Sequence, residues 1–438
     1  MPSPSEWRST LAFIAVLCWA QPLHGLNNGL SIKPHMGYNT WNCFYGSISE
    51  DIIKSTADIM VDSGLKKAGY EYLVIDDGWS ELNRGNDGKI VADPTKFPSG
   101  IKHVSDYIHS KGKHCLKYGM YSDAGPKTCL GLPGSRGNEE LDAQYFADLG
   151  VDFLKYDNCA AGPEDWIVDR YVAMRDALND TGRPILYSMC NWGVGDSWLW
   201  GPKVANSWRT TGDIAASWDS LLRCLDNTVG LSEFAGPGAW NDPDMLEVGN
   251  PGLTVNEQRA HFALWALLKS PLFIGADLRT LSREAKEILT APEVIAVNQD
   301  PLGVAGDLIW KQGPLEVYAG PLQGGGRAVA LFNRHAIGTQ YPISNITVAW
   351  KDLGFDSDVE ATVRDLHAEK DLGTFTTSFT GAVDIHDARM LRITPHKSKV
   401  DYESWRPWSK ENKALQASVR SSLSKLPTSN KRRMAVTS

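Results

Sequence analysis

The feature of this sequence that most constrains its fold is a regular alternation of short β-rich runs and amphipathic helical stretches between residues 36 and 303. Eight runs rich in aliphatic and aromatic residues lie at 37–41, 72–75, 116–121, 153–156, 185–189, 204–208, 239–240 and 272–274. Helical patterns separate them, for example at 49–63, 100–110, 139–148, 166–179 and 256–268. Eight strand–helix repeats over roughly 270 residues predict a (β/α)₈ (TIM) barrel.

The sequence changes in character after residue 303. Short β-rich runs at 315–318, 328–332, 346–350, 362–364 and 390–394 are split by turns rich in Gly, Asp and Pro, with no helical pattern between them. This pattern predicts a C-terminal antiparallel β domain, most simply a sandwich. The expected organisation is a signal peptide at 1–25, a barrel at 26–303, the β domain at 304–396 and a basic, disordered tail at 397–438.

Polar residues end nearly all of the predicted barrel strands. They are Asp76 and Asp77, Asp123, Asp157, Cys190, Arg209, Asp242 and Asp277. Barrel active sites are assembled at the carboxyl ends of the strands, whereas a barrel without a site would scatter its acids over the helices. The sequence therefore predicts an active site made of carboxylates with a few cations.

These residue types favour cleavage of glycosidic bonds over other chemistry. Two carboxylates can act on the bond, further acids can accept from sugar hydroxyls, and some of the 16 Trp can stack on sugar rings, although most are expected in the core. The sequence has no Cys-x-x-Cys or His-x-x-x-His spacing and no phosphate-binding glycine loop, so we expect no metal and no cofactor; an acid-rich Mg²⁺ or Ca²⁺ site is the alternative. A net charge of −8 argues against nucleic acid as a partner.

The N-terminal segment predicts export. Arg8 precedes an apolar stretch at 11–20, which is too short to span a bilayer and ends in small residues typical of a signal cleavage site. A buried helix or an uncleaved anchor is the alternative interpretation. No later stretch is long and apolar enough for membrane insertion, and sequons at Asn179 and Asn345 predict N-glycosylation. We expect a secreted protein, or one sent to a vacuole or lysosome.

Four sequence blocks resemble the α-galactosidases (melibiases) of glycoside hydrolase family 27. They are Tyr-Leu-Val-Ile-Asp-Asp-Gly-Trp at 72–79, Lys-Tyr-Asp-Asn at 155–158, Ser-Trp-Arg-Thr-Thr-Gly-Asp at 207–213 and Trp-Asn-Asp-Pro-Asp-Met-Leu at 240–246. The resemblance runs in order from residue 28 to about 395. It implies a retaining exo-α-galactosidase that releases terminal α-D-galactose from oligosaccharides, polysaccharides or glycolipids through a covalent galactosyl-enzyme, without a cofactor.

The resemblance also assigns the catalytic pair. Asp157 matches the family's nucleophile and Asp213 its acid/base, and retention requires their carboxyl groups to lie only about 5–5.5 Å apart. Lys155 lies on the same face of the strand as Asp157, so we expect its charge to keep the nucleophile ionised. Asp213 has to hold a proton, and we therefore expect it in desolvated surroundings with little positive charge.

The resemblance gives eight further positions a place around the sugar. They are Trp41, Asp76, Asp77, Lys155, Cys190, Trp192, Arg209 and Met245. Asp76 and Asp77 match the acids that accept from the 6- and 4-hydroxyls, and a buried acceptor for the axial 4-hydroxyl selects galactose over glucose.

Three alternative functions are weighed against this one. Cys190 and Trp192 fill the space that an α-N-acetylgalactosaminidase needs for the acetamide group of its substrate. The retained Asp76 argues against a β-L-arabinopyranosidase, whose sugar lacks the 6-hydroxyl. A catalytically dead sugar-binding barrel is disfavoured because both catalytic carboxylates are present.

The cysteines divide into one implied bridge and several thiols. The resemblance implies a disulfide between Cys129 and Cys159, whereas Gly46 and Gly78 stand where many family members carry a second pair. Four other cysteines are expected as thiols: Cys43, Cys115, Cys190 and Cys224. A bridge between the second and the fourth of these is the alternative. Residues 113–115 resemble a short insertion away from the catalytic face.

Overall fold

The computed structural model describes residues 28–112, 115–162, 166–340 and 342–396, together with positions 405, 407 and 413. The predicted signal peptide, two of the three residues of the short insertion, and nearly all of the predicted basic tail lie outside the described residues. Among the described residues, no helix is long and apolar enough to cross a membrane.

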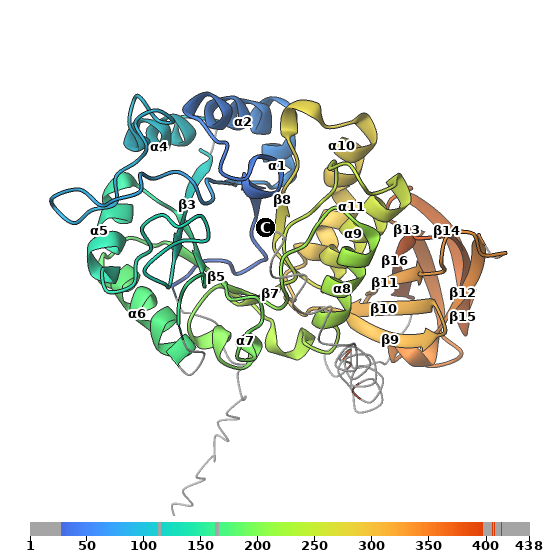
Figure 1. Cartoon of the computed structure of the whole chain (residues 1–438). Coiled ribbons are helices and arrows are strands. Elements are labelled where there is room, and N and C mark those ends of the chain that lie inside the picture. The colour runs from blue at the N-terminus through green and yellow to red at the C-terminus, as the bar shows by residue number, and fades with distance from the viewer. Residues whose placement is uncertain are drawn as a thin grey trace, which may run out of the picture.

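Eight parallel strands form one sheet in the order β7-β6-β5-β4-β3-β2-β1-β8, with a bridge from Leu246 to Ile274 that closes it (Figure 1). The strands are β1 (Met36–Asn39), β2 (Tyr72–Val74), β3 (Lys117–Asp123), β4 (Phe153–Asp157), β5 (Leu186–Cys190), β6 (Ser207–Arg209), β7 (Trp240–Asp242) and β8 (Leu272–Ile274). Each lies at or next to a predicted run, and the predicted barrel is confirmed.

Helices surround this sheet (Figure 1). They are α1 (Trp41–Phe44), α2 (Glu50–Asp62), α3 (Leu65–Ala68), α4 (Ile101–His109), α5 (Glu139–Leu149), α6 (Ile167–Asp180), α7 (Ser197–Trp200), α8 (Trp218–Thr228), α9 (Val255–Leu267), α10 (Arg283–Leu289) and α11 (Pro292–Asn298). Local sequence signals set several of their starts. The Ser49 hydroxyl caps α2, and Thr254 with Glu257 forms a capping box at the start of α9.

The alternation of side chains along β4 shows how a barrel strand places polar side chains inside the barrel. Leu154 and Tyr156 face the helices and join the main hydrophobic core. Phe153 packs inside the barrel, and Lys155, two residues further on, lines the central pocket. Because strand side chains alternate with a period of two, Asp157 emerges on the same inner side at the barrel mouth.

Aromatic rings fill the lower part of the barrel and form the floor of the pocket. The Phe153 ring centroid lies 5.3 Å from that of Phe273 and 5.6 Å from that of Tyr72. The interior is so crowded that a Cβ atom added at Gly37 would lie 2.7 Å from the Phe273 ring. A glycine on β1 therefore makes room for the large side chains of its neighbours.

The C-terminal domain is antiparallel, and the predicted β-sandwich class is confirmed. Its strands are β9 (Asp307–Gln312), β10 (Leu315–Pro321), β11 (Arg327–Asn333), β12 (Ile343–Ala349), β13 (Glu360–Asp365), β14 (Lys370–Thr376), β15 (Ser378–Asp384) and β16 (Ala388–Pro395). Six form a sheet in the order β14-β13-β16-β11-β10-β9, and β12 pairs with β15. The sequence patterns did not predict β9, β14 or β15, and β14 is an exposed edge strand with little hydrophobic alternation.

The β domain packs against the barrel helices α8 and α9, on the side seen in orange in Figure 1. Strand β11 is buried on both faces: Ala330 and Phe332 join the barrel-side core, while Val329 and Leu331 join the core between the two sheets. Helix α9 is buried nearly all round, as expected for a helix held between two layers. The two domains therefore share a continuous hydrophobic core.

Candidate active site

Side chains from the barrel strands and the segments that follow them converge on a central pocket. It encloses about 430 Å³ of space between atoms, part of it open to solvent. The polar lining residues are His35, Asn39, Lys155, Ser188, Cys190, Arg209, Asp242 and Asp244, with Met245 beside them. Six of these residues lie within the strands, namely Asn39, Lys155, Ser188, Cys190, Arg209 and Asp242, so the strands themselves hold much of the site.

Asp157 ends β4 and is only 5% exposed. Its Oδ1 accepts a hydrogen bond from the backbone N–H of Asn158 at 2.9 Å, and its Oδ2 accepts one from the Tyr121 hydroxyl at 3.1 Å. Burial raises the pKa of Asp157 to about 6, because desolvation disfavours the charged form. The carboxyl group is thus fixed in orientation and poorly solvated.

The ammonium group of Lys155 pairs with Asp76 and not with Asp157. Its Nζ forms an ion pair with Oδ2 of Asp76 at 2.7 Å. Its charge still lowers the pKa of Asp157, but burial of that carboxyl outweighs it and the pKa is raised overall. The expectation that Lys155 keeps the nucleophile ionised considered charge and left out desolvation, which acts in the opposite direction.

Asp76 and Asp77 follow the end of β2, and both are buried. Besides Lys155, Oδ2 of Asp76 accepts from the Asn39 amide at 2.7 Å. Asp77 accepts from the backbone N–H groups of Gly78 at 2.7 Å and Leu130 at 2.8 Å. Burial raises the pKa of Asp77. Because the strand has ended, the two adjacent acids are not forced to opposite sides of the sheet.

Asp213 lies in the loop after β6, and its surroundings differ from those that we expected. Its side chain is 60% exposed, and its Oδ1 forms an ion pair with Nη2 of Arg209 at 3.0 Å. We had expected desolvation and little positive charge. The reason for the difference is that Asp213 stands beyond the strand, where no core packing covers it.

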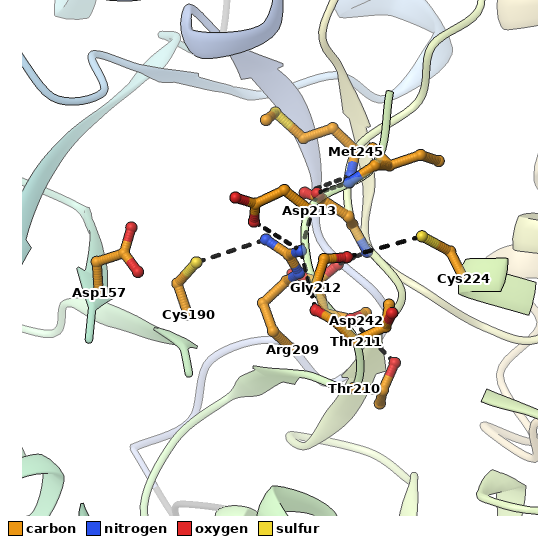
Figure 2. Close-up of polar contacts among 12 residues, drawn as sticks. Asp157, Cys190, Arg209, Thr210, Thr211, Gly212, Asp213, Cys224, Asp242 and Met245 are labelled. Carbon is orange, nitrogen blue, oxygen red and sulfur yellow. Dashed lines mark hydrogen bonds and ion pairs between the residues drawn. The ribbon is translucent and has the colours of Figure 1, made fainter. Parts of the chain in front are cut away.

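Figure 2 shows Asp157 on one side of Cys190, with Arg209 and Asp213 on the other. The carboxylate groups of Asp157 and Asp213 point toward this shared space. The negative charge of Asp213 raises the pKa of Asp157, so the two groups act on each other electrostatically. The predicted catalytic residues are therefore brought to opposite sides of one site.

Arg209 at the end of β6 organises one wall of this site. Its guanidinium donates to the Cys190 sulfur at 3.4 Å, to Asp213, and to Oδ2 of Asp244 at 2.9 Å. Asp244 was not among the predicted site residues. Its carboxylate also accepts from the backbone N–H of Ile214 at 2.8 Å, next to Asp213, although its own φ of +87° is strained for a non-glycine residue. Its position in the Asn-Asp-Pro-Asp block was the available signal.

The remaining predicted contacts lie around the same mouth. Trp41 is half-buried in the first turn of α1, and its backbone N–H donates to the Asn39 side chain at 2.8 Å. Met245 is buried in the pocket lining. Trp192 is half-buried with a φ of +55°, an uncommon conformation for a tryptophan. The acid after the last strand differs, because Asp277 forms a surface ion pair with Arg279 at 2.6 Å.

The structure joins Cys129 and Cys159 in a disulfide, as the resemblance implies. The Cys129 sulfur lies 3.6 Å from Oδ2 of Asp157, so the bridge borders the predicted nucleophile. The other described cysteines are free thiols: Cys43, Cys115, Cys190 and Cys224. Cys115 is exposed and Cys224 is buried, and the alternative bridge between these two is not formed.

Acidic and sulfur ligands come close together at one place in the described part of the chain. The ligand atoms of Asp123, Cys129, Asp157 and Cys159 lie within 4.8 Å of one another. Because the two sulfurs are joined in the disulfide, this group offers a metal ion only two carboxylates. Asp123 is fully buried, and burial raises its pKa to about 8.

Both predicted glycosylation sites are on the surface. Asn179 is exposed in the last turn of α6, and Asn345 is exposed on β12. Neither position contributes to the pocket.

Comparisons with known proteins agree with this architecture. The family profile described as "Alpha galactosidase A" matches residues 34–300, and that of the "Alpha galactosidase C-terminal beta sandwich domain" matches residues 312–393. "Alpha-galactosidase 3" of Arabidopsis thaliana is 50% identical over 375 residues, which cover 84% of each chain. The α-galactosidase of Coffea arabica is 48% identical over 374 residues, which cover 84% of this chain and 96% of the relative.

Solved structures give the same result. The crystal structure of α-galactosidase I from Mortierella vinacea has a TM-score of 0.80 at 40% identity and covers 84% of this chain and 98% of its own. The α-galactosidase from Saccharomyces cerevisiae, solved with raffinose, has a TM-score of 0.79 at 33% identity and covers 84% of this chain and 99% of its own. The chain therefore belongs to the α-galactosidase (melibiase) family of glycoside hydrolases, as the sequence resemblance predicts.

Proposed function

We propose that this protein is a retaining exo-α-galactosidase in which Asp157 is the nucleophile and Asp213 the acid/base. The observation that carries this proposal is the pair of carboxylates that face one shared space, one buried at the end of β4 and one exposed beyond β6. Retaining glycosidases need two carboxyl groups with different environments, because one attacks as an anion and the other must exchange a proton.

The first step forms a covalent intermediate. A carboxylate oxygen of Asp157 bonds to the anomeric carbon, the bond from that carbon to the leaving oxygen breaks, and Asp213 gives its proton to that oxygen. In the second step Asp213 takes a proton from water, the water oxygen bonds to the same carbon, and the Asp157 ester bond breaks. Two inversions release galactose with its original α configuration.

The contacts of Asp157 support its role, whereas Asp213 needs a bound sugar to reach the surroundings that its role requires. The burial of Asp157 leaves its carboxylate poorly solvated, and the hydrogen bonds from Tyr121 and Asn158 hold it in one orientation. Asp213 is open to solvent without substrate, paired with Arg209. We expect a bound sugar to cover Asp213, because displacing water from a carboxyl group favours its protonated form.

The acids at the end of β2 support galactose specificity. Asp76 and Asp77 are buried, and we propose that their oxygens accept from the 6- and 4-hydroxyls of the sugar. Glucose, with its 4-hydroxyl on the other side, would leave a buried acceptor unpaired, which is a strong basis for rejection. We propose Trp41, Lys155, Cys190, Trp192, Arg209 and Met245 as the other sugar contacts.

The substrates that we propose are terminal α-galactosides of oligosaccharides, polysaccharides or glycolipids. The related enzyme from Saccharomyces cerevisiae was solved with raffinose, which carries such a galactoside. We further propose secretion or delivery to a vacuole or lysosome, with glycosylation at Asn179 and Asn345.

Nucleophile rescue tests this assignment. Asp157→Asn should lose at least 10³-fold in kcat on an aryl α-galactoside, roughly the loss expected when a nucleophile is removed. Asp157→Gly should be equally inactive until azide is added, when azide bonds to the anomeric carbon and β-galactosyl azide accumulates. The matched control is Asp277→Asn, which changes a strand-end acid that is paired with Arg279 on the surface and should keep full activity. Full activity of either Asp157 variant would overturn the proposal.

Comparison of aryl substrates separates the alternatives in the same family. We expect the α-galactoside to be cleaved faster than the α-N-acetylgalactosaminide and the β-L-arabinopyranoside. The sequence resemblance puts Cys190, which accepts from Arg209 at 3.4 Å, where an acetamide would lie, and Asp76 is retained. Faster cleavage of either competitor would reassign the substrate, and binding without cleavage would favour a sugar-binding protein.

A further inference from the structure

Two loops that hold proposed sugar contacts meet at a pair of glycines. The loop after β1 carries Trp41 and reaches Gly46, and the loop after β2 carries Asp77 and continues into Gly78. A Cβ atom added at Gly78 would lie 2.8 Å from the Cα of Gly46, so the two backbones are in direct contact. The relative position of the Trp41 and Asp77 side chains therefore depends on this contact.

Both loops have a positive backbone φ at this point, which is unfavourable for residues other than glycine. Tyr45, just before Gly46, has a φ of +48°, which costs free energy for a residue with a side chain. Gly78 has a φ of +94°, which glycine adopts readily and other residues rarely do. Such backbone needs support from outside the loops to keep one arrangement.

Lys96 supplies this support. Its Nζ donates to the carbonyl oxygen of Gly46 at 2.9 Å and to that of Gly78 at 2.6 Å. The backbone of Lys96 is itself anchored, since its carbonyl accepts from the N–H of Glu50 at 2.8 Å at the start of α2. The ammonium group is thus held between the two loops and bonded to both.

We infer that Lys96 is a positioning residue that fixes the Trp41 loop against the Asp76–Asp77 loop and so sets the width of the sugar site. This inference rests on the proposed function, because it takes those side chains as sugar contacts. Leu130 strengthens the argument: its backbone N–H binds Asp77, and its Cδ1 would lie 2.9 Å from a Cβ atom at Gly46. Three loops therefore converge at the point that Lys96 holds.

The expected consequence is a loss of binding and not of chemistry. Both hydrogen bonds from the Lys96 ammonium go to loop carbonyls beside the proposed sugar contacts, and neither goes to Asp157 or Asp213. A looser pair of loops weakens the ground state and the transition state by similar amounts, which raises KM and leaves kcat nearly unchanged.

The test compares Lys96→Met, Lys96→Arg and Lys102→Met in the full chain, with an aryl α-galactoside as substrate. Lys96→Met removes the donor, and we expect KM to rise about fivefold while kcat stays within twofold. Lys96→Arg keeps a cation that can donate to both carbonyls and should restore KM to within twofold of wild type. Lys102→Met removes an exposed lysine of α4, bonded to Asp106, and should change neither constant.

Two results would overturn the inference. An unchanged KM in Lys96→Met would show that the loops hold their positions without the lysine. An equal loss in Lys96→Arg and Lys96→Met, together with a lower melting temperature in both, would show a role in folding alone.

Galactose binding by calorimetry separates this inference from the proposed function. A wild-type protein that binds galactose but cleaves no α-galactoside would contradict the proposed function. In that case the dissociation constants decide the inference, which requires about fivefold weaker binding in Lys96→Met. A wild-type protein that neither binds nor cleaves would overturn both.

Discussion

At the scale of single residues, burial of Asp157 favours its protonated form, whereas its proposed role as nucleophile requires the anion. Its carboxyl group is nearly inaccessible to water, and the nearest cation is committed to Asp76. Desolvation raises the pKa of Asp157 from its usual 3.8 to about 6. Near neutral pH the folded protein therefore holds a buried negative charge, at a cost of up to about 3 kcal/mol relative to the unfolded chain.

Removal of this charge should stabilise the fold. We expect Asp157→Asn to raise the free energy of unfolding at pH 7 by about 2 kcal/mol, since the amide keeps the shape and avoids the buried charge. The folded-state pKa is raised, so the cost exists above pH 6, shrinks as the folded protein takes up a proton, and vanishes below about pH 4. Thermal unfolding at pH 7 and pH 4 measures the difference. A variant less stable than wild type at pH 7 would contradict this account.

The residue scale is also where sequence-based prediction was least complete. Asp157, Cys190 and Arg209 could be predicted because each ends a strand whose pattern is local in the sequence. The ion pair between Lys155 and Asp76 could not be predicted, because the two residues belong to different strands that the fold brings together. The exposure of Asp213 could not be predicted either, because it depends on what packs over a loop.

At the scale of elements, the short helix α1 shows how the barrel holds a proposed sugar contact outside a strand. Trp41 begins α1, and the next residue, Asn42, donates its side-chain amide to Glu247 in the segment after β7. Glu247 is 2% exposed and also accepts from Asn250 at 2.5 Å. Burial raises the pKa of Glu247 to about 7, and the hydrogen bonds from Asn42 and Asn250 hold its carboxyl group in place.

Loss of this anchor should weaken substrate binding. Glu247→Ala leaves Asn42 without its acceptor, and we expect KM to rise about fivefold, equivalent to about 1 kcal/mol. Steady-state kinetics on an aryl α-galactoside measure the change. Glu287→Ala on α10, which removes an exposed acid paired with Arg283, is the matched control and should have no effect. A KM unchanged in Glu247→Ala would rule out this role.

The elements themselves were predicted with unequal success. All eight barrel strands lie at or next to local runs, because most of them are buried by helices and rich in apolar residues. The sequence patterns did not predict β14, because an exposed edge strand has no buried face and therefore no alternation of apolar and polar residues. Trp41 was expected at the end of a strand and instead begins α1, since the chain turns directly after Asn39.

At the scale of the whole molecule, the barrel and the β domain are joined by charge pairs as well as by the shared core. Arg334 after β11 binds both oxygens of Asp226 on α8, at 2.7 and 2.8 Å. It also binds Glu316 on β10 at 2.8 Å, and the Glu316 side chain is fully buried. The pKa of Arg334 is raised by these acids, so the group stays charged at the domain boundary.

Breaking this cluster should destabilise the protein without affecting catalysis. Arg334→Met leaves the buried Glu316 and the partly exposed Asp226 without this cation, and we expect the free energy of unfolding to fall by about 3 kcal/mol. Calorimetric unfolding measures the loss, and kcat/KM at 25 °C should stay at the wild-type value. The control is Arg283→Met, which breaks an exposed pair and should change stability by less than about 1 kcal/mol. An equally stable Arg334 variant would contradict a joining role for the cluster.

The claim that depends on the whole arrangement is retention by double displacement at the Asp157–Asp213 pair. Proton NMR of the first galactose released from an aryl α-galactoside tests it directly, before mutarotation mixes the anomers. Two inversions at the anomeric carbon predict that α-galactose appears first and that the β anomer grows in later. If β-galactose appears first, a single displacement by water operates and Asp157 is not a nucleophile.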